Sequence, residues 1–213
     1  LRNPSLYELY GSNGRTDSGK HVPNPNAKPE KSLTNELSVG YKFSEKLYVS
    51  STGYRSSISD ALLYDGSFNG GSGYTNTKGD LKQKGLETDL IFGNKEQKFS
   101  LYSSISSSKK IDGTRQLRRP DTTYGVKFSK KIQTSEGPVN LNYDYKHYGK
   151  SFDYNPGIKK IDSTDIMNIG ISQNYNGMIL TYGISNLLDE NYQRPIGYSQ
   201  EGIKLRLGVK QVF

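Results

Sequence analysis

The chain has 213 residues, of which 32% are hydrophobic, with a mean hydropathy of −0.77 and a formal net charge of +8. No stretch approaches the roughly 20 consecutive apolar residues that a membrane-spanning helix needs, whereas the strands of a β-barrel wall show lipid at every second residue and keep a low hydropathy. The absence of cysteine excludes disulfides, thiolate metal sites and cysteine nucleophiles.

Period-two alternation of apolar and polar residues predicts about nine strands. The first four cover about residues 32–43, 47–64, 80–92 and 98–108, and the other five contain residues 124–128, 139–145, 167–175, 178–184 and 203–213. In the first strand the apolar face carries Leu33, Leu37, Val39, Tyr41 and Phe43. Short turns alternate with long connections, which cover residues 65–78, 109–120, 149–162 and 186–202.

This alternation predicts an outer-membrane barrel with tight periplasmic turns and extended extracellular loops. Six aromatic residues stand beside short turns or at the C-terminus and predict an aromatic girdle at the periplasmic interface: Phe43, Phe92, Phe99, Phe128, Tyr175 and Phe213. An odd number of strands indicates part of a larger wall, because closed bacterial barrels nearly always have an even number.

The last predicted strand has the strictest alternation. Its apolar residues are Ile203, Leu205, Leu207 and Val209, and they alternate with Lys204, Arg206, Gly208 and Lys210. The pattern predicts one face toward lipid and one toward water. Taken by itself, the segment fits a soluble antiparallel sandwich equally well.

Two loops carry candidate ligand-binding residues. The glycine-rich loop could present Phe68 and Tyr74 to a flat ligand, and the basic loop holds Arg115, Arg118 and Arg119. The alternatives are a mobile loop and a solvated basic loop. Basic residues are spread through the chain and form no single stripe, which argues against nucleic acid and favours anionic ligands or lipopolysaccharide phosphates as partners.

The sequence predicts no catalytic centre, metal site or cofactor. The aspartates lack the spacing of a calcium loop. His147 is placed at the outer lip of the predicted sheet as an interfacial residue. Asp144 stands three positions away and therefore on the opposite face of the strand, so the two do not form a catalytic pair.

Several phrases resemble TonB-dependent outer-membrane receptors. The phrase Leu1-Arg2-Asn3-Pro4-Ser5-Leu6-Tyr7-Glu8-Leu9-Tyr10 is followed by a second that contains Asn24, Pro25, Pro29 and Glu30. Gly85-Leu86-Glu87 is similar to a strand motif of the family, and the phrase from Asn186 and Leu187 through Asp189 to Tyr192 is similar to the motif before its final strand. The similarity extends over essentially the entire chain.

The resemblance implies a fold and a location. The fold is an all-β transmembrane antiparallel barrel wall of about nine strands, with residues 1–213 as the C-terminal part of a 22-stranded barrel in the outer membrane of a Gram-negative bacterium. A plug domain and the N-terminal strands would lie outside this chain, and the TonB complex would act through that plug. Phe213, Leu207 and Val209 would form the signal read by the barrel-assembly machinery.

The resemblance also implies a function, the TonB-energised uptake of a scarce nutrient. Residues 53–60, 116–119 and 197–202 are similar to the cobalamin receptor branch, so cobalamin is the first expectation. An iron-siderophore or haem receptor is the second. A passive porin or a structural barrel is the alternative from another class.

Overall fold

The computed structural model describes residues 1–17, 19–154 and 157–211. The described part is almost entirely β-structure. Its elements are α1 (Leu6–Tyr10), β1 (Lys31–Ser44), β2 (Leu47–Ser59), β3 (Leu62–Asp65), the short 3-10 helix η1 (Phe68–Gly70), β4 (Gly73–Asn76), β5 (Leu81–Gly93), β6 (Gln97–Lys109), β7 (Thr122–Ile132), β8 (Val139–Tyr148), β9 (Ser151–Tyr154), β10 (Ile158–Ile161), β11 (Thr164–Tyr175), β12 (Met178–Ser185) and β13 (Lys204–Gln211).

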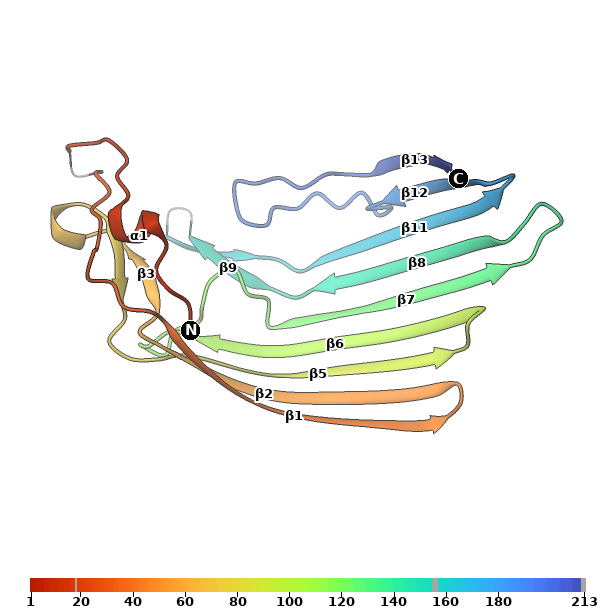
Figure 1. Ribbon diagram of the computed structural model, residues 1–213, viewed down its shortest axis with the longest axis horizontal. Coiled ribbons are helices and arrows are strands. Elements are labelled where there is room, and N and C mark those ends of the chain that lie inside the picture. Colours follow the sequence, from red (N-terminus) through yellow and green to blue (C-terminus); the bar gives the residue numbers. More distant parts are fainter. Residues whose placement is uncertain (18, 155–156, 212–213) are drawn as a thin grey trace. The chain divides into compact units, whose positions relative to one another are not determined.

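The main sheet is a nine-stranded meander in the order β1-β2-β5-β6-β7-β8-β11-β12-β13 (Figure 1). Each strand therefore pairs with the main-sheet strands that precede and follow it in the chain. The predicted count of about nine strands is confirmed. The chain divides into two compact units: the first contains residues 1–36, 54–84 and 107–116, and the second contains residues 37–53, 85–106 and 117–213.

Strand register in the second unit separates an apolar face from a polar one. Ile171 of β11 lies opposite Tyr182 of β12, and Tyr182 lies opposite Leu207 of β13. On the other face of the same strands, Gly183 lies opposite Arg206. Because successive side chains of a strand point to opposite faces, the apolar row and the basic residues of β13 are separated as predicted.

Short turns close the second unit at one end of its strands, as Figure 1 shows. The turn between β11 and β12 consists of Asn176 (φ 47°) and Gly177 (φ 76°). Tyr175 and Met178 on either side of it are register partners. Two positive φ values are those of the two-residue hairpin turn that favours Asn-Gly, and this is one of the short turns that the sequence pattern predicts.

Five of the six aromatic residues predicted for the girdle belong to the described part of the chain and lie near these turns: Phe43, Phe92, Phe99, Phe128 and Tyr175. Phe99 and Phe128 are register partners, and Phe43 and Phe92 are exposed. Phe213 lies outside the described residues.

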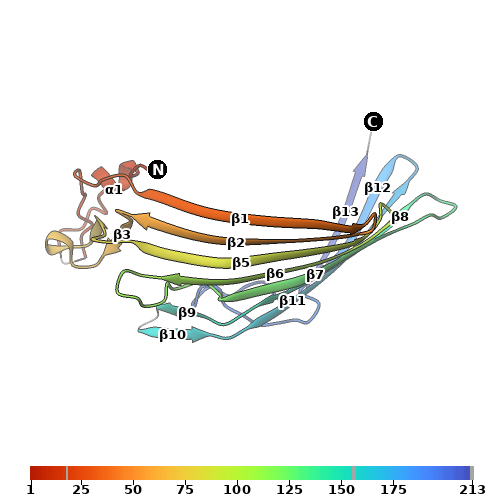
Figure 2. The ribbon, with the colours of Figure 1, turned by 90° about the horizontal axis from the view of Figure 1, so that it is seen from below.

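The long connections contain elements that the sequence pattern did not predict. The second strand was expected to continue to residue 64, but β2 ends at Ser59 and Asp60 takes a φ of 53°, which breaks the strand before β3. Residues 149–162, expected as a loop, contain β9 and β10, which form a hairpin of their own (Figure 2). Four-residue strands and a five-residue helix are too short to show a clear period.

Little apolar surface is buried in the described part of the chain. Its buried apolar side chains are Ala61, Leu62, Leu81 and Ile161. By contrast, Leu205 and Leu207 of β13 are 74% and 80% exposed. A continuous exposed apolar row on a sheet is the surface that a lipid environment would cover.

None of the helices in the described ranges is long and apolar enough to cross a membrane.

Candidate functional site

A buried carboxylate joins three loop segments in the second unit. Asp153 of β9 is 1% exposed, and its Oδ1 accepts a hydrogen bond from Arg118 Nε at 2.7 Å. Its Oδ2 accepts from the backbone N–H of Ile196 at 2.9 Å, and the N–H of Tyr154 donates to Oδ1. Asp153 therefore connects the β6–β7 loop, the β9–β10 hairpin and the loop before β13. We call this arrangement the Asp153 junction.

Electrostatics at the Asp153 junction favour the charged carboxylate. Burial by itself would raise the pKa of Asp153, but the hydrogen bond from Arg118 and the two backbone donors outweigh it, and the pKa lies below its ordinary value. The carboxylate is thus ionised near neutral pH and holds its three donors.

Arg194 of the same unit lies over an aromatic ring and, in the described part of the chain, has no carboxylate partner. The Arg194 guanidinium lies 4.8 Å from the centre of the Tyr148 ring, and Lys146 Nζ lies 4.6 Å from the same ring. Arg194 Nη2 donates to the backbone carbonyls of Gly149 (3.3 Å) and Asp162 (3.4 Å). Within the described ranges neither cation has a carboxylate partner, and Arg194 Nε is buried without a hydrogen bond. We call this group the Tyr148 platform.

Burial lowers the pKa of the Arg194 guanidinium and outweighs the opposite effect of the neighbouring Tyr148 and Tyr192. Burial also raises the pKa of the neighbouring Tyr192 phenol. A half-buried, uncompensated guanidinium beside a second cation would gain free energy from a bound anion.

The Tyr148 platform belongs to the polar face of the sheet. Lys146 of β8 lies opposite Gly125 of β7, while the flanking pair Val126 and Tyr145 belongs to the other face. A Cβ atom at Gly125 would collide with the Tyr102 hydroxyl, so this glycine leaves room for the Tyr102 ring to lie across β7. Lys127 Nζ lies 5.5 Å from the centre of the same ring.

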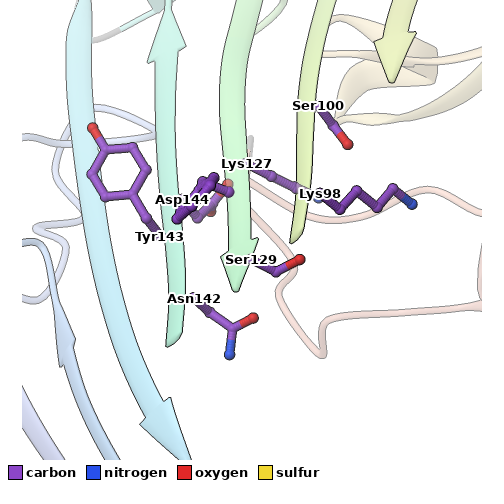
Figure 3. Close-up of a pocket in the computed structure, with 8 residues that line it drawn as sticks. Lys98, Ser100, Lys127, Ser129, Asn142, Tyr143 and Asp144 are labelled. Atoms are coloured by element: carbon purple, nitrogen blue, oxygen red, sulfur yellow. The ribbon is translucent and has the colours of Figure 1, made fainter. Parts of the chain in front are cut away.

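A polar recess of about 290 Å³ lies farther along the same three strands. Figure 3 shows its lining side chains, of which Lys98, Ser100, Lys127, Ser129, Asn142, Tyr143 and Asp144 are labelled. Asp144 Oδ1 is buried and has no hydrogen-bond partner in the part of the chain that the structure describes. The recess therefore offers cations and an unsatisfied carboxylate oxygen to a polar partner.

His147 lies on the opposite, apolar face and pairs with Asp165 of β11. Its Nδ1 is 2.7 Å from Asp165 Oδ1, and the Tyr145 hydroxyl donates to the same oxygen at 2.6 Å. The Tyr124 ring stacks on the imidazole at 4.5 Å. Asp144 lies on the other face, as predicted, but the sequence analysis missed Asp165 because cross-strand register is not visible in the period of one strand. Within the described ranges no group of three acidic, histidine or cysteine side chains could hold a metal ion.

Comparison with known proteins decides the family. Residues 1–187 match the family described as TonB dependent receptor-like, beta-barrel. The chain belongs to the TonB-dependent receptor family. Members of this family are receptors and transporters of the Gram-negative outer membrane and not enzymes, so the predicted fold and location are confirmed. No curated protein sequence matches the chain.

Solved structures of TonB-dependent receptors share the fold. The siderophore receptor PirA from Acinetobacter baumannii has a TM-score of 0.74 and 16% identity, over 92% of this chain and 33% of that one. The copper transporter OprC has a TM-score of 0.74 and 17% identity, over 100% and 35%. The FrpB iron transporter from Neisseria meningitidis has a TM-score of 0.69 and 13% identity, over 90% and 32%. The chain thus spans about a third of the length of these receptors.

The N-terminal phrases of this receptor chain form a clip network in the first unit. Arg2 Nε donates to Glu30 Oε2 at 2.6 Å, and its terminal nitrogens reach Glu8 at 3.1–3.2 Å. Glu30 Oε1 accepts from the backbone N–H of Leu62 at 2.6 Å. Glu8 also completes the capping box of α1 with Ser5. These residues hold the start of the chain against β3.

The remaining residues of the second phrase also act on the backbone. Asn24 Nδ2 donates to the Tyr74 carbonyl at 3.0 Å, and the Asn24 carbonyl accepts from Ala27 N, which closes a turn around Pro25. Pro25 suits the second position of such a turn because its φ is fixed. Pro29 directly precedes Glu30, which forms an isolated antiparallel bridge with Arg2.

The phrase before β13 folds around Asn186, which is 4% exposed. Its side chain donates to the carbonyls of Glu190 and Glu201 and accepts from the N–H of Glu190. Asp189 Oδ1 accepts from the N–H of Ile203 at 2.9 Å. The adjacent Leu187 donates its N–H to the Met167 carbonyl at 2.8 Å, and the Tyr192 carbonyl accepts from Gln200 N. This phrase fixes the path of the chain into β13.

The predicted ligand-binding residues belong to different elements of the chain. Phe68 is in η1 and Tyr74 is in β4, where its ring lies 5.9 Å from that of the buried His21. Arg115 forms a backbone bridge with Lys109, and Arg118 is engaged by Asp153. Arg119 also has an interaction partner. Leu207 and Val209 lie in the exposed apolar row of β13. Their predicted roles stay predictions.

The sequence analysis missed Arg194 and Asp153. Both residues lie in segments that were read as loops without period, and no motif marks them. A signal was available at Tyr148, since it continues the polar row of β8 beyond Lys146 and puts an aromatic ring beside a cation.

Proposed function

We propose that this chain forms the C-terminal part of the wall of a receptor that takes up a negatively charged metal chelate. The observation that carries the proposal is the Tyr148 platform, where Arg194 and Lys146 lie over one ring without a carboxylate partner among the described residues. Two cations beside an aromatic ring suit a ligand that combines negative charge with flat rings, as many siderophores do.

The position of the platform supports a role in transport. In outer-membrane barrels the polar face lines the interior and the apolar face meets lipid. Lys146 belongs to the polar face, so the platform would face the route of the nutrient. Membership of the receptor family argues against a passive porin.

The named relatives also support a metal-containing ligand. Their names describe an iron transporter, a siderophore receptor and a copper transporter. Haem is an iron chelate with flat rings and acidic groups and belongs to the same proposal. Cobalamin, the first expectation from the sequence, becomes the second candidate here, on the similarity of residues 53–60, 116–119 and 197–202 to the cobalamin receptor branch.

We infer that the complete barrel has 22 strands and that a plug domain fills it and receives energy from the TonB complex. The polar recess of Lys98, Lys127 and Asp144 would contact the plug. Leu207, Val209 and Phe213 would form the assembly signal, and lipopolysaccharide would surround the long-loop end.

Ligand binding by the complete receptor tests this proposal. Calorimetry should compare an anionic ferric catecholate, haem and cyanocobalamin, together with a neutral ferric hydroxamate. We expect the anionic chelate to bind more tightly than the neutral one by about tenfold or more, since two cations line the platform. Binding of cyanocobalamin without binding of any iron chelate would instead favour the cobalamin branch.

A further inference from the structure

A second polar recess, of about 480 Å³, lies within the second unit next to the Tyr148 platform. Its walls are β11, the end of β12, the loop before β13 and β13 itself. We call it the Ser185 recess, and the residues that line it include Ile166, Asn168, Ser185, Tyr192, Gln200 and Glu201.

The Ser185 recess shares its border with the platform. Ile166 of β11, which lines the recess, is the cross-strand partner of Lys146, one of the two platform cations. Gln200 Nε2 donates to the Arg194 carbonyl at 3.2 Å, and the phenol of Tyr192 is within the electrostatic range of the Arg194 guanidinium. A ligand held at the platform could therefore extend into the recess along the polar face of the sheet.

The recess carries neutral polar groups that the chain leaves unused. In the described ranges neither the Ser185 hydroxyl nor the Tyr192 hydroxyl has a hydrogen-bond partner. Gln200 uses its side-chain nitrogen for the carbonyls of Arg194 and Tyr198, and its Oε1 accepts no hydrogen bond from those parts of the chain. Hydroxyl groups can donate and accept, so the recess can pair with either kind of polar group.

Charge distinguishes the recess from the platform. The platform holds two cations and no carboxylate among the described residues, whereas the recess is lined by one residue of each sign, Glu201 and Arg206. The Glu201 carboxylate also accepts a hydrogen bond from Lys204 Nζ at 2.7 Å. A recess with balanced lining charges and free hydroxyl groups suits an uncharged part of a ligand better than a second anion.

We propose that the Ser185 recess binds an uncharged arm of the chelate, rich in amide and hydroxyl groups, while the Tyr148 platform holds the anionic head. The Ser185 and Tyr192 hydroxyls and Gln200 Oε1 would form hydrogen bonds with the arm. The inference rests on the proposed function and adds the class of nutrient, a chelate with a peptide-like arm. A site built to form hydrogen bonds rejects an analogue that leaves its polar groups unpaired, so the recess would determine specificity.

Two ferric chelates of equal charge test the arm separately from the head. The tris-catecholate complexes of dihydroxybenzoyl serinamide and of dihydroxybenzoyl butylamide share the anionic head, and their arms are polar in the first and alkyl in the second. Calorimetry of the complete receptor in detergent should show that the serinamide complex binds about tenfold more tightly, because only its arm can pair with the recess. Equal affinities of the two complexes would overturn the proposal.

The variant Ser185→Ala/Tyr192→Phe removes both unused hydroxyls and keeps the ring. It should weaken binding of the serinamide complex about tenfold and change binding of the butylamide complex by less than about twofold. The matched control Ser103→Ala/Tyr182→Phe removes the same two groups from the apolar face, where Tyr182 lies opposite Leu207, and should match the wild type. Unchanged binding of the serinamide complex by the recess variant, or an equal fall in the control, would contradict the assignment.

The single variants keep the test decisive if the double variant does not assemble. Ser185→Ala and Tyr192→Phe should each weaken binding of the serinamide complex about threefold, and no change in either would contradict the proposal.

Arg194→Gln separates the two proposals, since it should weaken binding of both complexes by the same factor. If both complexes bind equally well and Arg194→Gln weakens both, the platform stands and the assignment of the recess is wrong. If the wild-type receptor binds neither complex, the proposed function fails and the recess assignment fails with it.

Discussion

Arg118 and Arg194 stand in the same unit and in equally irregular segments, yet their surroundings are opposite. Arg118 donates to Asp153, a carboxylate that is 1% exposed and also holds the N–H of Ile196. Arg194 lies over Tyr148 and donates to backbone carbonyls, and its Nε has no partner in the described part of the chain. One guanidinium satisfies a buried charge, whereas the other carries its own charge uncompensated.

This difference assigns the two arginines to different roles, Arg118 to the stability of the fold and Arg194 to ligand binding. A paired arginine contributes to the folded state, because its removal leaves a buried carboxylate with fewer donors. An uncompensated arginine costs free energy in the empty protein and recovers it when an anion binds. The Asp153 junction should therefore control the order of the loops, and the Tyr148 platform should control affinity.

Loss of the carboxylate at the Asp153 junction should reduce stability more than any other substitution considered below. The variant Asp153→Ala leaves three donors without their acceptor and should lower the free energy of unfolding by about 3 kcal/mol. Urea titration of the complete receptor in detergent measures this value. A loss below about 0.5 kcal/mol, the range of ordinary surface substitutions, would show that the junction does not hold the loops.

The clip network of the first unit should show a smaller effect of the same kind. Glu30→Ala removes the acceptor of Leu62 N–H and a partner of Arg2, with an expected loss of about 2 kcal/mol. Glu30→Gln keeps an acceptor and should lose about half as much. Hydrogen exchange of the Leu62 amide measures the local effect, and unchanged protection in Glu30→Ala would contradict it.

Acid should abolish the advantage of Asp153 over asparagine. The folded pKa of Asp153 lies below its ordinary value, so its contribution is complete above the unfolded pKa of about 3.9 and is lost as the pH falls through the folded pKa. The difference in unfolding free energy between wild type and Asp153→Asn should thus be constant from pH 7 to about 5 and shrink below about pH 4. A difference that does not change with pH would mean that the carboxylate charge is not involved.

Substitution of either arginine should change the free energy of unfolding least, but in opposite directions for Arg118 and Arg194. Arg118→Gln should lower the free energy of unfolding by about 1 kcal/mol, since the Arg118 side chain is 62% exposed and solvent screens the pair. Arg194→Gln should leave stability unchanged or raise it slightly, because it removes a charge that burial disfavours. Thermal unfolding of the two variants side by side tests this order, and a larger loss in Arg194→Gln would reverse the comparison.

The sequence predicts the wall better than the sites. Alternation along a strand is a local property, so the nine strands and the apolar row of Leu205 and Leu207 follow from the sequence. The partners of Arg118 and His147 stand 35 and 18 residues away, and those contacts depend on register and loop path. The family phrases are visible in the sequence, but the contacts by which Glu30 and Asn186 hold the backbone are formed only in the folded chain.

The affinity of the complete receptor for an anionic ferric chelate, compared in wild type, Arg194→Gln and Arg118→Gln, shows directly whether the Tyr148 platform binds the ligand. Calorimetry at fixed ionic strength should show a loss of about tenfold to a hundredfold in Arg194→Gln and a loss below about threefold in Arg118→Gln, because a charge-assisted contact is removed from the ligand in the first variant alone. Equal affinities of the wild type and Arg194→Gln would contradict the assignment of the Tyr148 platform as the ligand site.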